Sequence, residues 1–249
     1  MLWATALTLL VAQTLSEPVR IVELDAPLDH VQGLEVGDAV FWVTEVRPQS
    51  KTGALHEFAL DSGKLLRSVD LTFGARYHPG GLIAREDMLW TPVAEYKPSS
   101  SAWVVAVDKR TLKVRRQIEV GSDHIGALVE AERRLWGANW DARHFVNIAS
   151  SEKTPNPNAT RYQDMKFDGT HIVASGLLDG GGVIDWLNPS SFALVRRIHV
   201  GKTDRGVVFT NEGMAIRDGL LYLLPEDGPA SLQSTGRKSR LFIFRLPGD

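Results

Sequence analysis

The sequence contains no cysteine in its 249 residues. Disulfide bonds, thiol catalysis and zinc sites built on cysteine are therefore excluded. It also lacks an excess of either charge, because the formal net charge is −2. No general electrostatic field attracts this chain to nucleic acid or to an anionic membrane, and we expect neither as a partner.

Long hydrophobic runs are scarce as well. Residues 2–15 are apolar or small, with no charge before Glu17, but this run is too short to span a bilayer. It matches the apolar region of a secretory signal, so we expect residues 1–16 to be a signal peptide and residues 17–249 to be exported, to the periplasm or the extracellular space. A buried N-terminal segment is the alternative. We expect no membrane span in the rest of the chain.

Helical periodicity is missing outside this N-terminal run, and an internal repeat is present instead. Five segments, beginning at residues 30, 78, 124, 161 and 210, each carry an apolar anchor, a polar turn and a second apolar residue eight positions after the anchor. Alternating residues around a short Gly/Asp turn predict a β-hairpin in each segment. The anchors are Leu34, Leu82, Leu128, Met165 and Met214.

A second pair of strand signals follows the first, second and fourth hairpins, and the anchors recur every 37 to 49 residues. Four strands at this period are typical of a β-propeller blade. We predict an all-β, five-bladed β-propeller in a single domain, with blades near residues 28–72, 76–121, 122–160, 161–201 and 208–246. In the third blade, "SSEKTPNPNATR" is expected to replace the last strand because of its two prolines. Residues 19–24, "VRIVEL", match the other outer strands and should complete the fifth blade, which closes the ring.

Five short motifs carry a family resemblance: "HPGGL" (78–82), "PVAEYKP" (92–98), "DHIG" (123–126), "YQDMK" (162–166) and "LPEDG" (224–228). As a set they resemble an uncharacterised family of bacterial and plant propeller proteins, classed only as a domain of unknown function. The resemblance covers nearly all of residues 20–246. It implies the five-bladed fold and implies no activity.

Polar residues concentrate at the free ends of the hairpins. The first strand of a propeller blade lines the axis and pairs antiparallel with the second, so both free ends open on one face of the disc. His30, His78 and His124 each lie four residues before an anchor, which places them at similar distances from the axis. The pattern predicts a ligand-binding axial pocket, whose candidate residues are His30, Gln32, His78, Glu95, His124, Asn139, Trp140, Asp141, Arg143, Gln163, Asp164, Asn211, Glu212 and Glu226.

The three histidines also form a candidate metal set with Glu212. Neutral imidazoles and a carboxylate suit Zn²⁺ or a non-haem iron. The alternative for His30, His78 and His124 is structural, a hydrogen bond from each ring to the neighbouring blade. Arg143 could hold a carboxylate or a phosphate, or make a surface salt bridge.

Three functions follow from this pattern. The first is an exported protein, a monomer, that binds a small polar or anionic molecule at the axis. The second is a hydrolase or lyase that uses the same pocket, with or without a divalent metal. The third is a scaffold for protein–protein contacts. The sequence carries no HExxH, GxSxG or Walker pattern that would select a reaction.

Overall fold

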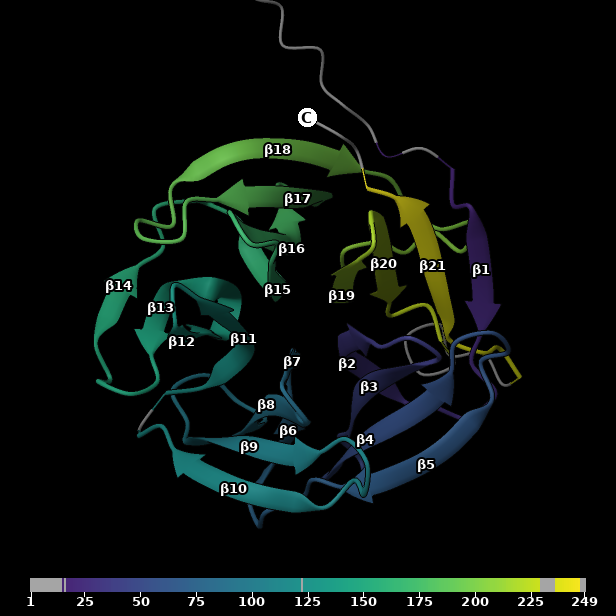
Figure 1. Ribbon diagram of the computed structural model, residues 1–249, viewed down its shortest axis with the longest axis horizontal. Helices are drawn as coiled ribbons and strands as arrows, with labels where there is room; N and C mark the ends of the chain where they lie inside the picture. The colour runs from purple at the N-terminus through teal and green to yellow at the C-terminus, as the bar shows by residue number, and fades with distance from the viewer. Residues whose placement is uncertain (1–14, 16, 122, 229–235, 247–249) are drawn as a thin grey trace, which may run out of the picture.

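The computed structural model describes residues 15, 17–121, 123–228 and 236–246. Five antiparallel sheets are arranged as blades around a central axis (Figure 1). The arrangement confirms the predicted five-bladed β-propeller. The expected signal peptide lies almost wholly outside the described residues. Within the described part of the chain, no helix has the length and apolar character needed to cross a membrane.

Each blade has four strand positions ordered from the axis outward, and in the second blade the inner position is divided into two short strands. The first blade has β2 (His30–Val36), β3 (Val40–Arg47), β4 (Thr52–Ala59) and β5 (Leu65–Asp70), and the second has β6 (Arg76–Pro79) with β7 (Ile83–Arg85), β8 (Met88–Glu95), β9 (Ala102–Asp108) and β10 (Val114–Glu119). The third has β11 (Ile125–Ala131), β12 (Arg134–Asn139), β13 (His144–Asn147) and β14 (Lys153–Pro155), and the fourth has β15 (Arg161–Phe167), β16 (Ile172–Leu178), β17 (Gly181–Leu187) and β18 (Leu194–Val200). The fifth has β19 (Glu212–Arg217), β20 (Leu220–Pro225), β21 (Arg240–Arg245) and β1 (Arg20–Glu23).

The N-terminal strand closes the ring, as predicted. Strand β1 pairs antiparallel with β21, and Val22 lies opposite Leu241. The purple strand therefore lies beside the yellow end of the chain in Figure 1. The pairing covers the edge of β21, which would otherwise expose a row of unpaired backbone groups.

The third blade differs from the prediction. The expected replacement of its fourth strand was wrong, because β14 pairs with β13 through Lys153, Thr154 and Pro155. The strand is only three residues long and lies at the outer edge of its sheet. Proline is tolerated there because an edge strand has one side without ladder hydrogen bonds.

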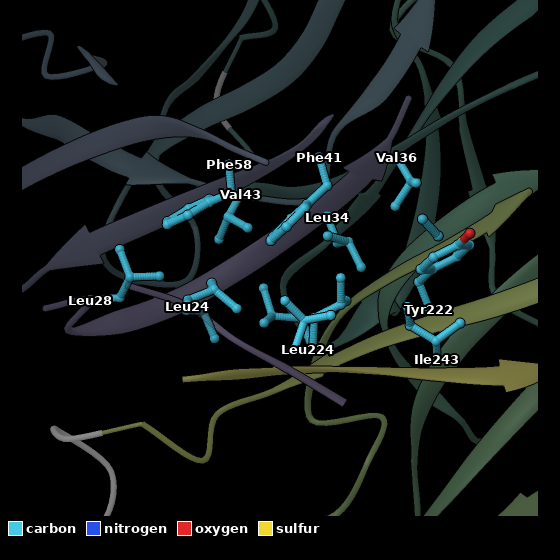
Figure 2. Packing of buried hydrophobic residues seen from close by; sticks show 14 residues of the cluster. Leu24, Leu28, Leu34, Val36, Phe41, Val43, Phe58, Tyr222, Leu224 and Ile243 are labelled. Atoms are coloured by element: carbon cyan, nitrogen blue, oxygen red, sulfur yellow. The ribbon is translucent and has the colours of Figure 1, made fainter. Parts of the chain in front are cut away.

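The core lies between neighbouring blades. All five anchors are fully buried, with 0% of each residue's surface exposed. Between the first and fifth blades, Leu34 packs in one cluster with Phe41, Phe58 and Leu224 (Figure 2). The rings of Phe41 and Phe58 stack at 5.2 Å between centroids. Full burial of each such side chain contributes about 1.5–3 kcal/mol, which fixes the blades against one another.

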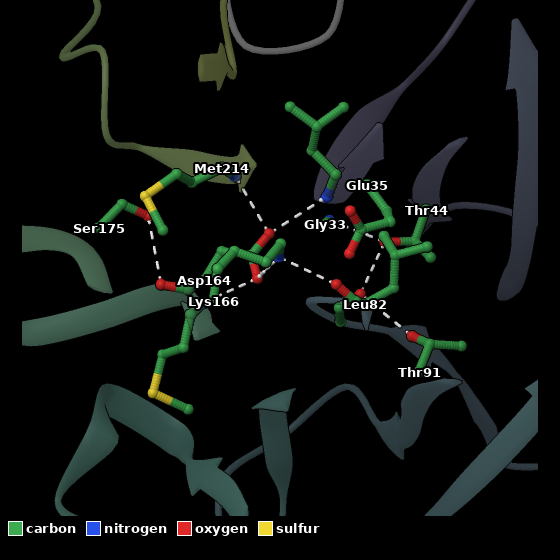
Figure 3. A network of polar contacts seen from close by, with 12 residues as sticks. Gly33, Glu35, Thr44, Leu82, Thr91, Asp164, Lys166, Ser175 and Met214 are labelled. Atoms are coloured by element: carbon green, nitrogen blue, oxygen red, sulfur yellow. Dashed lines mark hydrogen bonds and ion pairs between the residues drawn. The ribbon is translucent and has the colours of Figure 1, made fainter. Parts of the chain in front are cut away.

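Asp164 and Lys166 form a buried ion pair on the inner strand β15 that contacts other inner strands, and we call these two residues the axial plug (Figure 3). The residue before the anchor is Gly33, Gly81, Ala127 or Gly213 in the other four blades, and it is Asp164 in the fourth. A Cβ atom at Gly81 would lie 2.7 Å from Oδ1 of Asp164, so this carboxylate needs glycine opposite it.

Contacts of the axial plug reach four blades. The backbone N–H groups of Leu34 and Met214 donate to Oδ2 of Asp164 at 3.2 and 3.1 Å. Nζ of Lys166 donates to Oδ1 of Asp164 at 2.7 Å and to the carbonyl of Leu82 at 2.9 Å. The plug therefore links the fourth blade to the first, second and fifth.

Candidate functional site

A cavity of about 190 Å³ lies where the inner strands begin. Its lining comes from the starts of β2, β6, β11 and β19, from β15 and from the 3₁₀ turn η1 (Trp140–Ala142) that follows β12. Nine of the predicted residues line it: His30, Gln32, His78, His124, Asn139, Trp140, Asp141, Gln163 and Glu212. Tyr96, Gly126 and Tyr162 complete the lining.

Two neutral histidines form one half of the cavity. Nε2 of His78 lies 2.8 Å from Oε1 of Gln32, whose amide nitrogen donates to the carbonyl of Val31. The Gln32 oxygen is therefore an acceptor, so Nε2 of His78 carries the hydrogen and Nδ1 carries the lone pair. That Nδ1 is buried, and no residue in the described part of the chain forms a hydrogen bond with it.

In His124 the hydrogen is on the other ring nitrogen, Nδ1. Its Nδ1 lies 2.9 Å from the carbonyl oxygen of Glu95 and 3.2 Å from that of Lys97, and carbonyls only accept. The lone pair is therefore on Nε2, for which the described residues supply no hydrogen-bond partner. Burial lowers the pKa of both His78 and His124, so both rings are neutral at pH 7.

Aromatic rings surround these two histidines. The ring of Tyr96 meets that of His78 edge to face at 4.6 Å between centroids, and the ring of Trp140 meets that of His124 in the same way and at the same distance. The rings of His78 and His124 are themselves 5.0 Å apart. We call His78, Tyr96, His124 and Trp140 the neutral half of the cavity.

His30 and Glu212 from the lining, together with Glu226 beside His30, make up what we call the charged half of the cavity. One ligand atom from each lies within 4.8 Å of the others, and Nδ1 of His30 forms an ion pair with Oε1 of Glu226. Burial opposes the charge on His30, but the hydrogen bond to Glu226 and the field of Glu212 outweigh burial and raise its pKa to about 8. Burial raises the pKa of Glu212 to about 7, against the opposing charge of His30.

Glu212 has an unusual environment and backbone. It is 8% exposed, and its carboxylate has no hydrogen-bond donor among the described residues. Its φ angle is +118°, a conformation that costs energy for any residue with a side chain. Strained backbone of this kind persists where the surrounding structure holds a side chain in a required position.

The other five predicted residues lie outside the cavity lining. Glu95 pairs with Lys97 and Ser101 through its carboxylate, and supports His124 only through its carbonyl. Arg143 has 72% of its side chain exposed and lies 3.6 Å from Asp141 at the surface. Asp164 belongs to the axial plug. The backbone carbonyl of Asn211 accepts a hydrogen bond from the backbone N–H of Glu226. Glu226 faces His30.

The candidate metal set is divided between the two halves. His78 is bound to Gln32 and His124 to backbone carbonyls, whereas His30 faces Glu212 and Glu226. The structural alternative, a bond from each ring to the neighbouring blade, holds for Nε2 of His78 and Nδ1 of His124, and Nδ1 of His30 pairs in the same way with Glu226 of the fifth blade.

Tyr96 was missed by the sequence analysis, although the strand pattern contained a signal for it. His78 pairs with Ala94, and side chains two residues apart on a strand share a face. Tyr96 therefore follows Ala94 onto the face of His78, and Glu95 points to the other face. A bulge between Arg76 and His78 shifts the register and conceals this relation in the sequence.

Comparisons with known proteins agree with the fold. The profile of a family of unknown function (DUF6454) matches residues 8–168. No curated protein matches the sequence. Glutaminyl cyclase of Myxococcus xanthus is similar in structure, with a TM-score of 0.64, 14% identity, and coverage of 92% of this chain and 95% of that one.

Two further solved structures are similar at lower scores. The PQQ-bound aldose sugar dehydrogenase of Streptomyces coelicolor has a TM-score of 0.53 at 10% identity, over 92% of this chain and 97% of that one. A Thermus thermophilus protein described as an oxidoreductase (glucose dehydrogenase) has a TM-score of 0.51 at 10% identity, over 90% of this chain and 99% of that one. At identities this low, the similarity supports a shared propeller fold and no shared activity. The family match covers well over half of the sequence, and the chain belongs to the DUF6454 family of unknown function.

Proposed function

We propose that this protein binds a small polar molecule, rich in hydrogen-bond donors, in the neutral half of the axial cavity. The observation that carries the proposal is the lone pair on Nε2 of His124, which is fixed by the bonds of Nδ1 to two carbonyls and has no partner among the described residues. The buried lone pair on Nδ1 of His78 is a second acceptor to which none of the described residues donates. An unsatisfied buried polar atom costs about 1–3 kcal/mol, and a ligand donor would relieve that cost.

The charge of the lining favours a neutral or cationic ligand over an anionic one. The described lining residues include Glu212 and Asp141 but neither lysine nor arginine. Tyr96 and Trp140 offer ring faces and edges for the apolar side of a sugar, a polyol or an amine. Sugars, polyols and primary amines combine donors with a compact carbon frame, and they are the classes we propose.

Calorimetric titration with glucose, glucosamine, glycerol and ethanolamine tests the proposal. Loss of one ligand hydrogen bond at His124 should weaken binding by about 1–3 kcal/mol, which is roughly 5- to 150-fold, in a His124→Ala variant. The matched control is His199→Ala, because His199 is exposed on the outer strand β18. Equal affinities in wild type and His124→Ala would reject the site, and preferential binding of succinate or citrate would reject the ligand class.

Catalysis at the same place is the second candidate. The lone pair of His124 is suited to accept a proton from a bound hydroxyl or water, which is the role of a general base in a hydrolase or lyase. Mass spectrometry of the titrated compounds after overnight incubation would detect products. Products formed by wild type and absent with His124→Ala would favour an enzyme over a binding protein.

Export and a monomeric state complete the proposal. The apolar residues 2–15 support export. Sequencing the N-terminus of protein recovered from the periplasm or the medium would test export, and an intact N-terminus in the cytoplasmic fraction would contradict it. Light scattering after gel filtration would test the monomeric state, by comparing the mass in solution with the 27.5 kDa of one chain.

A further inference from the structure

We propose that His30, Glu212 and Glu226 bind a divalent transition-metal ion in the charged half of the cavity. Their ligand atoms all lie within 4.8 Å of one another. In a tetrahedral zinc site with bonds of about 2.1 Å, ligand atoms lie about 3.4 Å apart. Small side-chain movements would therefore bring the three groups onto one ion.

The state of Glu212 is the independent observation that points to a cation. More than nine-tenths of the residue is buried, and no hydrogen bond from the described residues satisfies its carboxylate. Burying a carboxylate that accepts no hydrogen bond costs free energy, and the facing His30 ring offsets only part of this cost, since burial still raises the pKa of Glu212. The φ angle of +118° shows that the backbone also accepts a cost at this position. A bound metal ion would offset both costs.

Two of the ligands begin inner strands of neighbouring blades, and the third follows the second strand of the fifth blade. Glu212 begins β19 opposite Pro225, the last residue of β20, and Glu226 follows directly. The backbone N–H of Glu226 donates to the carbonyl of Asn211 at 2.9 Å, which holds the two glutamates side by side. His30 begins β2 of the adjacent first blade.

The ligand types select the class of metal. One imidazole and two carboxylates suit Zn²⁺ or Mn²⁺, whereas Ca²⁺ takes six to eight oxygen ligands. Three protein ligands leave at least one coordination position, and both His30 and Glu212 line the cavity. The ion would therefore be open to a molecule bound in the neutral half.

Calorimetric titration of the EDTA-treated full chain with ZnCl₂ and with MnCl₂ tests the site. We expect one ion per chain, and a loss of affinity of at least about a hundredfold in Glu212→Gln and in His30→Ala, because loss of even a hydrogen-bond partner of a metal ligand costs about 10- to 100-fold. His124→Ala and the surface variant His199→Ala should bind the metal as wild type does. Wild-type affinity in Glu212→Gln, or no binding of either metal to the wild type, would overturn the proposal.

Thermal unfolding separates loss of the site from loss of the fold. In metal-free buffer Glu212→Gln should melt at or above the wild-type temperature, because it removes a buried carboxylate whose desolvation cost His30 offsets only in part. Added Zn²⁺ should raise the melting temperature of wild type and leave that of Glu212→Gln unchanged. An equal rise in both proteins would contradict the site. The proposed polar ligand is tested separately, since His124→Ala should lose it while keeping the metal.

Discussion

Replacing Asp164 in the axial plug with alanine should be among the most damaging single changes in this protein. The carboxylate accepts hydrogen bonds from Lys166 and from the backbone N–H groups of Leu34, Met165 and Met214. Its removal leaves the buried Lys166 ammonium with the carbonyl of Leu82 alone. Breaking a buried ion pair on one side costs about 3–5 kcal/mol.

Matched variants separate the charge from the packing. Lys166→Met should cost less than Asp164→Ala, because the remaining Asp164 keeps three backbone donors and can take up a proton. Burial already raises the pKa of Asp164 in the folded protein. The folded state of Lys166→Met therefore binds more protons than the unfolded state, and its stability should fall as the pH rises above the ordinary value of 3.8. The double variant should recover part of the loss.

Urea unfolding and thermal melting measure these differences. In a chain of about this size each kcal/mol lowers the melting temperature by about 2–4 °C, so Asp164→Ala should melt roughly 6–20 °C below wild type. A loss below about 1 kcal/mol in Asp164→Ala would refute the reasoning, because surface pairs are worth that much or less.

Three further predictions concern stability. Burial would raise the pKa of Glu45, but hydrogen bonds from His56, Arg47 and the backbone of Asp29 outweigh burial and lower it. The stabilisation of the fold by ionised Glu45 should therefore be complete above pH 4.5 and lost at lower pH. The unfolding free energy of Glu45→Gln should accordingly decline less steeply in acid than that of wild type. Leu128→Ala should cost about 2–5 kcal/mol in urea unfolding and His124→Ala only about 1 kcal/mol, and equal costs would contradict the separation of core from site. Removing the chain through Leu24 should expose the edge of β21 and cost several kcal/mol, whereas an unchanged melting temperature would contradict closure of the ring by β1.

The fold could be predicted because its determinants repeat. Anchors, turns and outer strands recur at nearly constant spacing, so each copy supported the others, and the match of residues 19–24 to the outer strands gave the closure. Strand β14 was missed because the prolines were judged by propensity, whereas position at a sheet edge decides whether proline is tolerated.

The candidate site was less predictable because its details depend on register and on long-range contacts. Asp164 was placed in the pocket with Gln163 as a polar residue at the free end of a hairpin, but the strand pairing is irregular between Tyr162 and Asp164, and only Gln163 of the two lines the cavity. Lys166 lies two residues on, shares the face of Asp164 and forms the ion pair. The small residues at the equivalent position of the other blades were the available signal for this plug. The pairing of His30 with Glu226 has no such signal, because it joins the first blade to the fifth.

The most direct test of the account is a crystal structure of the protein soaked in each compound of the titration panel. We predict electron density for one compound in the axial cavity, with a donor atom about 2.7–3.2 Å from Nε2 of His124 and its carbon frame against Tyr96 and Trp140. Density for these compounds only outside the cavity, at concentrations that saturate binding in solution, would contradict the claim that the axis is the binding site.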